Sequence, residues 1–462
     1  MIKRKLNWKR GLTLALAAIM LFAVPVEARA DIYWPDGPSI QTPNAVVIEM
    51  NSGAVLYEKN SKQIKYPASI TKIMTTMLAL EYCELDEVVT FSDDAIKYNQ
   101  GNTSHIARDY GEKMTMEQCL YATMLESANE CAYAVAEHVG QKLGGDYRTF
   151  IDLMNERAKE LGCTNTNFNN ANGLPDEDHW TTAYDMALIS AEAYKNETFQ
   201  IIIGTRSYRI PPTNKHDEIT PLNNHHAMIS NYKTNKYIYK PCTGGKTGYT
   251  DLSGNTLVSY AEKDDLTLVC VVMQSDAENQ YVDTTSLFEY CFQNFQSVSI
   301  GDNEAAEDEK DKGIMGNHDP FMKLDENARI ILPITADVSD VEMSLVRDKL
   351  PSGVIAQLNY TYGGHLAGRV NIVLSNAEVE ENYFDGENKS EDINIIEIKA
   401  TDILLVVGIV AVISALIHLG KRLYDNFYVI LHDLQVKEQR KRRFRPISKK
   451  KKKWKKRDRM FK

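Results

Sequence analysis

The sequence predicts an α/β (α+β) domain, followed by a small all-β domain and one transmembrane helix. Strand-like and helical patterns interleave across residues 31–297, whereas residues 319–395 show strand alternation without a helical period. A 17-residue apolar run at residues 403–419 is the candidate span. The length of 462 residues accommodates two or three domains, and a hydrophobic share of 43% is ordinary for a folded protein.

Residues 1–30 have the pattern of a secretory signal peptide. A basic start is followed by an apolar run at residues 12–24 and by Ala28-Arg29-Ala30, a small-x-small cleavage site. The alternative, an uncleaved membrane anchor, is disfavoured because the apolar run is short. We therefore expect the body of the protein to be exported.

The domain at residues 31–297 opens with an expected β-hairpin. Residues 44–50 are strand-like, Asn51-Ser52-Gly53 supplies a turn, and residues 54–57 return. A helix is expected from about Ser69, because apolar residues recur there on one helical face. These residues are Ile70, Ile73, Met74, Met77 and Leu78.

Four further elements follow in this domain. A helical region is expected at about residues 116–139, with a polar break near its middle. Two strand-like runs at residues 256–260 and 266–273 flank a turn at residues 262–265. A last helix is expected at about residues 284–295.

The middle of the chain changes composition twice. Residues 298–318 are expected to form a linker, because their centre is acidic and poor in apolar groups. Residues 319–395 are expected to form a small β-rich domain, with strands at residues 328–332, 354–360 and 366–374. This domain would hold the first one away from a membrane.

Residues 403–419 would form about 26 Å of helix, enough to cross a thin bilayer, although a buried core helix is the alternative. The basic segment at residues 420–462 follows, so the positive-inside rule places the C-terminus in the cytoplasm. Residues 437–462 carry a net charge of +14, which leaves −24 for the rest of a chain whose total is −10. Because this tail adjoins the span, we expect it to contact membrane lipids rather than nucleic acid.

Three short motifs stand in one order along the first domain: Ser69-Ile70-Thr71-Lys72, Ser127-Ala128-Asn129 and Lys246-Thr247-Gly248. Ser-x-x-Lys and Ser-x-Asn also occur elsewhere in the chain, but Lys-Thr-Gly occurs once. Only the set beginning at Ser69 has its partners downstream in this order. Together the motifs indicate an acyltransferase with an active-site serine.

The first motif supplies a candidate nucleophile, Ser69, and its candidate base, Lys72. An alcohol needs a base within hydrogen-bond reach, and a lysine three residues further along a helix lies on the same side. Burial and a second cation, Lys246, are expected to lower the pKa of the Lys72 amine, so that it can accept a proton.

The second motif interrupts an apolar helical stretch, so we expect Ser127 and Asn129 to point into a cleft. Ser127 is the candidate proton relay to a leaving amine, and Asn129 is the candidate ligand of a substrate amide. The alternative is a buried polar pair that the backbone satisfies.

The third motif is suited to bind a substrate. Lys246 and Thr247 are candidate ligands of a carboxylate, and Gly248 lets the substrate backbone approach closely. The backbone N–H groups of Ser69 and Tyr249 form the candidate oxyanion hole.

Cysteine usage argues against a disulfide framework. The seven cysteines are odd in number, and they lack the Cys-x-x-Cys spacing typical of zinc or redox chemistry. Cys119, Cys131 and Cys270 lie in apolar stretches and are expected to pack as small hydrophobic residues. We expect neither a metal nor a cofactor.

Around the three motifs the chain resembles the low-molecular-weight D-alanyl-D-alanine carboxypeptidases, serine peptidases known as penicillin-binding proteins. The resemblance covers roughly residues 40–297. It is carried by residues 66–75, 125–132, 136–140, 168–175, 182–187 and 245–250. One departure is Asn224-His225-His226, which stands where the family more often shows a second asparagine.

The resemblance implies a β-lactamase/DD-peptidase-like sheet flanked by helices, with a helical subdomain that carries Ser127. It implies removal of the terminal D-alanine from peptidoglycan stem pentapeptides through an acyl-enzyme at Ser69, with β-lactams as covalent inhibitors. The expected signal peptide, span and basic tail add a single-pass topology in the bacterial cell membrane, with the catalytic domain outside the cytoplasm. In this the chain departs from many members of the family, which end in an amphipathic anchor.

Two alternatives stay open. A class A β-lactamase needs a deacylating glutamate in Glu-x-x-Leu-Asn spacing, and Glu218 with Leu222-Asn223 is one residue too long. The other alternative is a membrane-anchored sensor that binds peptidoglycan or β-lactams without turnover.

Overall fold

The computed structural model describes residues 33–97, 103–300, 322–324, 328–347, 354 and 356–374. The chain divides into two compact units, residues 1–380 and 381–462, and every described residue belongs to the first. The expected signal peptide, most of the linker, the span at residues 403–419 and the basic tail lie outside the described residues. Among the described residues, no helix has the length and apolar character to cross a membrane.

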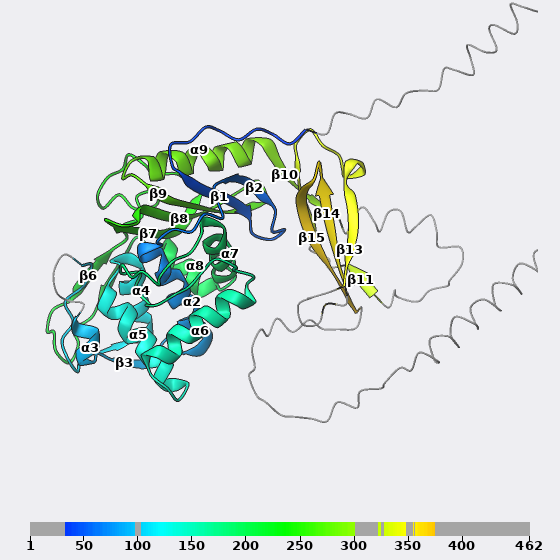
Figure 1. Ribbon diagram of the computed structural model, residues 1–462. Coiled ribbons are helices and arrows are strands. Elements are labelled where there is room, and N and C mark those ends of the chain that lie inside the picture. The colour runs from blue at the N-terminus through cyan, green and yellow to red at the C-terminus, as the bar shows by residue number, and fades with distance from the viewer. Residues whose placement is uncertain are drawn as a thin grey trace, which may run out of the picture. The chain divides into compact units, whose positions relative to one another are not determined.

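A five-stranded antiparallel sheet forms the centre of the fold (Figure 1). Its strand order is β2-β1-β9-β8-β7, so the first hairpin of the chain pairs with strands that lie some 200 residues later. The strands are β1 (Asn44–Glu49), β2 (Val55–Lys59), β7 (Cys242–Thr250), β8 (Gly254–Lys263) and β9 (Leu266–Ser275). The predicted hairpin and the two predicted later strands are confirmed.

The turn between β8 and β9 shows how local sequence sets this sheet. Asp264 and Asp265 both have positive φ, 53° and 62°. A two-residue turn with positive φ matches the right-handed twist of the strands it joins, and aspartate tolerates that backbone better than most residues.

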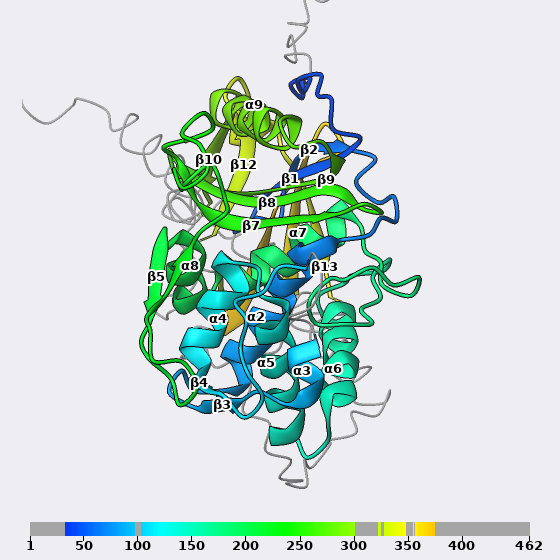
Figure 2. The same ribbon diagram turned by 90° about the vertical axis from the view of Figure 1, so that its left-hand side faces the viewer.

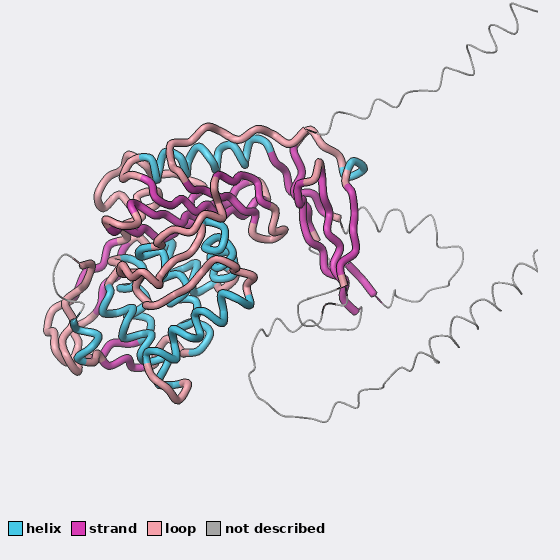
Figure 3. Tube along the Cα trace, in the orientation of Figure 1, coloured by secondary structure: helices cyan, strands magenta, loops and turns pink. Residues whose placement is uncertain are grey.

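Helices cover both faces of the sheet (Figures 2 and 3). Helix α9 (Asn279–Asn294) packs on one face and begins five residues earlier than predicted. The remaining long helices lie on the other side: α2 (Lys72–Tyr82), α4 (Met116–Leu125), α5 (Asn129–Lys142), α6 (Tyr147–Glu160), α7 (Ala183–Tyr194) and α8 (Glu197–Gly204). Of these, α7 and α8 make the main contacts with the strands.

The strands divide their side chains between two hydrophobic cores. In β9, Val269, Val271 and Met273 join the core on the side of α2, whereas Leu268, Cys270 and Val272 join the core beneath α9. This alternation is the period-2 pattern that the sequence displays. All seven cysteines are free, and Cys119, Cys131 and Cys270 are buried as predicted.

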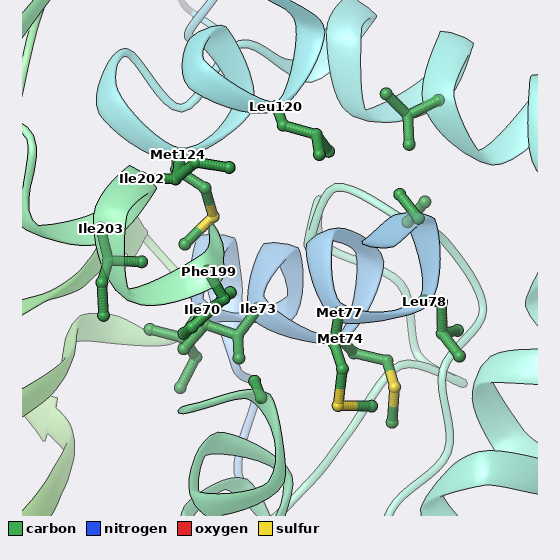
Figure 4. Close-up of a cluster of buried hydrophobic side chains, with 14 of the residues drawn as sticks. Ile70, Ile73, Met74, Met77, Leu78, Leu120, Met124, Phe199, Ile202 and Ile203 are labelled. Carbon is green, nitrogen blue, oxygen red and sulfur yellow. The ribbon is translucent and has the colours of Figure 1, made fainter. Parts of the chain in front are cut away.

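Helix α2 is the centre of the helical side. The five apolar residues predicted for its inner face are buried and pack beside Leu120, Met124, Phe199, Ile202 and Ile203 (Figure 4). The helix is buried on other faces as well, because Lys72, Thr75 and Thr76 are also inaccessible to solvent. A helix buried this completely has little freedom to move, and it carries the candidate base at its first residue.

Short elements connect these parts. Two small antiparallel pairs are formed by β3 (Val88–Thr90) with β4 (Lys113–Thr115) and by β5 (Ser207–Ile210) with β6 (Thr220–Asn223). A short helix, α3 (Asp93–Ile96), follows β3, and a 3₁₀ turn, η1 (Ala68–Thr71), precedes α2.

Beyond α9 the described residues are mainly strands. Strand β10 (Phe295–Ser299) pairs with β12 (Arg329–Pro333), and a second sheet has the order β11-β15-β14-β13. Its strands are β11 (Met322–Leu324), β13 (Glu342–Val346), β14 (Ala356–Tyr362) and β15 (His365–Leu374), with a 3₁₀ turn, η3 (Val338–Asp340), before β13. Three strands were expected here, matching β12, β14 and β15, whereas β10, β11 and β13 were not.

A buried leucine on α2 and an exposed isoleucine on α8 predict a large difference between two substitutions. Leu78→Ala removes a fully buried side chain and should lower the free energy of unfolding by about 2–5 kcal/mol. Ile201→Ala, at a side chain that is 61% exposed, should change it by about 0.5 kcal/mol or less. Chemical denaturation followed by tryptophan fluorescence measures both. Equal losses would contradict the packing described for this core.

Candidate active site

Ser69 lies in the 3₁₀ turn η1, three residues before α2 begins at Lys72. The preceding residue, Ala68, has a φ of 53°, which costs energy for a residue with a side chain. One bond within the turn and one from the sheet hold it. The Thr71 hydroxyl donates to the Ala68 carbonyl at 2.9 Å, and the Thr256 hydroxyl of β8 donates to the Pro67 carbonyl at 2.8 Å. The serine is therefore presented on a rigid, strained turn.

Lys72 is completely buried beneath Ser69. Its Nζ lies 3.0 Å from Ser69 Oγ, 2.7 Å from Asn129 Oδ1 and 2.5 Å from the Asn172 carbonyl oxygen. Burial, and secondly the positive charge of Lys246, hold the pKa of the Lys72 amine well below its usual range. A neutral amine at this distance can accept the hydroxyl proton of Ser69, as expected from the spacing of the first motif.

The second motif forms the break between α4 and α5. Ser127 has a φ of 60°, and Asn129 is the first residue of α5, with its N–H donating to the Ser104 carbonyl at 2.9 Å. The Asn129 side chain accepts from Lys72, and the Ser127 hydroxyl accepts from Lys246 Nζ at 3.0 Å. The predicted break is confirmed, and its two polar side chains bond to the two lysines rather than to the backbone.

Lys246 lies on β7, which is one of the two edge strands of the central sheet. It is buried, and burial lowers the pKa of its amine to about 7, against an opposing effect of Glu126. Besides Ser127, its Nζ donates to the Thr247 carbonyl at 2.8 Å. The third motif therefore brings a second buried amine to the same site.

Gly248 packs directly against the nucleophile turn. A Cβ at this position would lie 2.8 Å from Ser69 N and 2.4 Å from Thr256 Oγ1, so only glycine fits. The next residue, Tyr249, is 61% exposed, and its hydroxyl donates to Asp251 at 2.9 Å. The backbone of β7 thus runs beside the N–H of Ser69, where the oxyanion hole was expected.

Two contributors to the site were not predicted. One is the carbonyl of Asn172, which accepts from Lys72 and belongs to a loop 100 residues away. The other is His179, whose Nδ1 accepts from the Asn169 N–H at 3.0 Å, so its Nε2 carries the proton and donates to Thr71 Oγ1 at 2.9 Å. Burial lowers the pKa of His179 to about 4, which keeps this arrangement neutral.

The Asn224-His225-His226 segment has a structural role. Asn224 Nδ2 donates to the carbonyls of Ile203 and Thr205 at 3.1 and 2.9 Å, so this side chain binds backbone. His225 Nε2 lies 2.9 Å from the carboxylate of Glu126, the residue before Ser127. The segment therefore contacts the residue that precedes the second motif.

A cavity of about 410 Å³ lies next to the nucleophile turn. It is bounded by the residues that precede Pro67, by the loop before α7, by the turn between β7 and β8 and by the end of β9. Its lining residues are Ile64, Lys65, Tyr66, Glu177, Trp180, Leu252, Ser253 and Gln274.

The family model for D-alanyl-D-alanine carboxypeptidases matches residues 33–277 of this chain. D-alanyl-D-alanine carboxypeptidase DacF of Bacillus subtilis (strain 168) is 32% identical over 296 residues, which cover 63% of this chain and 72% of the relative. The D-alanyl-D-alanine carboxypeptidase of Streptomyces sp. (strain K15) is 28% identical over 60% of this chain and 94% of its own.

Solved structures agree with these relatives. The Streptomyces K15 DD-transpeptidase matches with a TM-score of 0.51 and 27% identity, covering 56% of this chain and 100% of its own. Penicillin binding protein 5 from Haemophilus influenzae matches in fold with a TM-score of 0.57 at 24% identity, covering 74% of this chain and 98% of its own. The central sheet and its helices thus form a DD-peptidase-like α/β fold. The chain belongs to the D-alanyl-D-alanine carboxypeptidase family and is a serine carboxypeptidase.

Proposed function

We propose that this chain removes the terminal D-alanine from peptidoglycan stem pentapeptides through an acyl-enzyme at Ser69, and that β-lactams acylate the same serine. The observation that carries the proposal is the contact of 3.0 Å between Ser69 Oγ and a completely buried Lys72 amine. The carboxypeptidases among the relatives support the same substrate class, and they do not favour a β-lactamase or a sensor without turnover.

Acylation begins when Lys72 accepts the Ser69 hydroxyl proton and Oγ attacks the carbonyl carbon of the penultimate D-alanine. The N–H groups of Ser69 and Tyr249 stabilise the oxyanion, each worth about 3 kcal/mol. When the C–N bond breaks, the leaving amine takes a proton from Ser127. Lys246 then returns a proton to Ser127 across the 3.0 Å contact between these residues.

Deacylation uses the same groups in the opposite direction. A water molecule attacks the acyl carbon and gives its proton to Ser127 and, through it, to the now neutral Lys246. The Ser69 oxygen leaves and recovers its proton from Lys72, so both lysines return to their starting states. Asn129 serves both steps, because it holds Lys72 at 2.7 Å and can turn its amide toward the substrate.

Substrate recognition falls to the third motif. The Lys246 ammonium and the Thr247 hydroxyl bind the free carboxylate of the terminal D-alanine. Gly248 leaves room for the peptide backbone to lie along the edge of β7, where an extended chain can follow an unpaired strand. Because this site requires a free carboxylate on the substrate, the enzyme prefers the C-terminal residue of the peptide.

We also propose the placement of the chain in the cell. Residues 1–30 would direct export, residues 403–419 would cross the bacterial cell membrane once, and residues 420–462 would contact membrane lipids in the cytoplasm. The strands between residues 319 and 395 would form a small β-rich domain between the catalytic domain, residues 31–297, and the membrane. The four-stranded antiparallel sheet β11-β15-β14-β13 supports this last part.

Two substitutions test the nucleophile and its base. Ser69→Ala should abolish the covalent penicillin adduct, and Lys72→Ala should slow its formation by about 10³-fold or more, because groups that act as a unit fail together. Intact-mass analysis of the full chain after exposure to penicillin measures both. Ser230→Ala is the matched control, since it alters another Ser-x-x-Lys sequence and should keep the adduct. A Lys72→Ala variant with wild-type acylation would refute the lysine base.

The buried amine of Lys246 predicts a pH dependence. Its pKa is lowered to about 7, so the ammonium that attracts the substrate carboxylate is lost as the pH rises through this value. The kcat/KM for a D-Ala-D-Ala peptide should therefore fall on the alkaline side with an apparent pKa near 7. Lys246→Arg keeps its charge, so its kcat/KM should be lower but flat there. An unchanged alkaline limb in Lys246→Arg would assign it to another group.

The proposed membrane topology predicts protection of the basic tail. In intact cells stripped of their outer layers, added protease should cleave the catalytic domain and leave a C-terminal epitope after residue 462 intact. Permeabilising the membrane should then expose the epitope. Cleavage of the tail in intact cells would place it outside and refute the topology.

A further inference from the structure

Three side chains with metal-ligating atoms meet outside the three motifs. Cys83 directly follows α2, Glu87 directly precedes β3, and His138 lies on α5. Their ligand atoms all lie within 4.8 Å of one another. Across the described part of the chain, this is the one group of three or more histidine, cysteine and acidic residues that meets this condition.

The carboxylate of this group is held in position before any ion binds. Glu87 Oε1 accepts from the Glu84 N–H at 2.8 Å and from Lys142 Nζ at 2.5 Å. Glu87 Oε2 lies 3.0 Å from His138 Nε2. One oxygen is therefore fixed by a neighbouring backbone group and a lysine, while the other turns toward the imidazole and the thiol.

The other two ligands come from well-packed elements. Cys83 is the C-cap of α2, where its N–H donates to the Ala79 carbonyl at 3.0 Å. His138 stands one helical turn before Lys142 on α5, so the imidazole and the lysine that orients Glu87 share one helix face. Glu87 and His138 are partly accessible, so an ion can reach the group from their side.

A thiolate, an imidazole and a carboxylate are a ligand set that suits zinc, and three protein ligands leave a fourth position for water. Zinc binds the thiolate form of cysteine, so the Cys83 thiol releases its proton when the ion binds.

We propose that Cys83, Glu87 and His138 bind a zinc ion that ties the end of α2 to α5. These are the two helices whose first residues, Lys72 and Asn129, contact each other in the active site at 2.7 Å. The ion would join the same helices at a second point, and Lys142 would keep its bond to Glu87 Oε1. It would stabilise the arrangement of the site without touching the substrate.

Cobalt(II) is the probe for the thiolate ligand, because a cobalt–thiolate bond gives a charge-transfer absorption band. The full chain should develop this band with one equivalent of cobalt and lose it when zinc is added. Cys83→Ser should abolish the band, whereas Cys163→Ser, at a buried cysteine elsewhere, should retain it. No band in the wild type, or an equal band in Cys83→Ser, would overturn the proposal.

Zinc affinity and thermal stability supply a second readout. His138→Gln should weaken zinc binding by about 100-fold or more and remove the rise of Tm that zinc causes in the wild type. His216→Gln is the matched control, because His216 also contacts a glutamate, Glu112, at 3.1 Å, but is not part of the cluster. Covalent labelling by penicillin verifies that each variant is folded. Equal zinc affinity in His138→Gln and the wild type would refute the site.

Discussion

The burial of two lysine amines in one site is the constraint on which the rest of the structure depends. Desolvation disfavours the charged form of Lys72 and Lys246, and the positive charge of Lys246 further disfavours that of Lys72. Hydrogen bonds to five acceptors, some close in the sequence and some distant, compensate for this burial. These acceptors are Ser69 Oγ, Asn129 Oδ1, the Asn172 carbonyl, Ser127 Oγ and the Thr247 carbonyl.

The backbone around the site adopts unusual conformations that bring these acceptors to the lysines. The break between α4 and α5 exists where Ser127 and Asn129 turn toward the lysines, and Ser127 adopts a φ of 60°. Ala68 adopts a similar strained φ of 53° beside the nucleophile. Strain of this kind persists only where the surroundings enforce it. Here Gly173 packs against Ala68 so closely that a Cβ would lie 1.9 Å from the Ala68 oxygen.

Local patterns in the sequence were sufficient for the elements whose burial follows a simple period. The strands β1, β8 and β9 alternate between two cores, and the polar pair at Ser127 and Asn129 marks the helix break. Strand β13 was missed because its side chains are mostly exposed, so no buried face imposes an alternation. The start of α9 was placed too late because its first turn contains polar residues.

The candidate site was predictable to the extent that its groups are side chains in short motifs. The spacing of Ser69 and Lys72 predicts their contact, because both lie on consecutive helical turns. The Asn172 carbonyl and His179 act from a loop 100 or more residues away, and a backbone carbonyl leaves no trace in residue identity. The group at Cys83, Glu87 and His138 was not predicted either, because its members are separated in the sequence and meet only in the folded chain.

The central claim is that Lys72 is neutral at the pH at which the enzyme works. The most direct test is a titration of the lysine side chains in the full chain by NMR, with ¹³C at Cε and the Lys72 signal assigned by its loss in Lys72→Arg. If Lys72 is neutral in the working enzyme, this signal titrates well below the usual lysine value of 10.5. A Lys72 signal that titrates near 10.5 would contradict the proposed role of this lysine as the base.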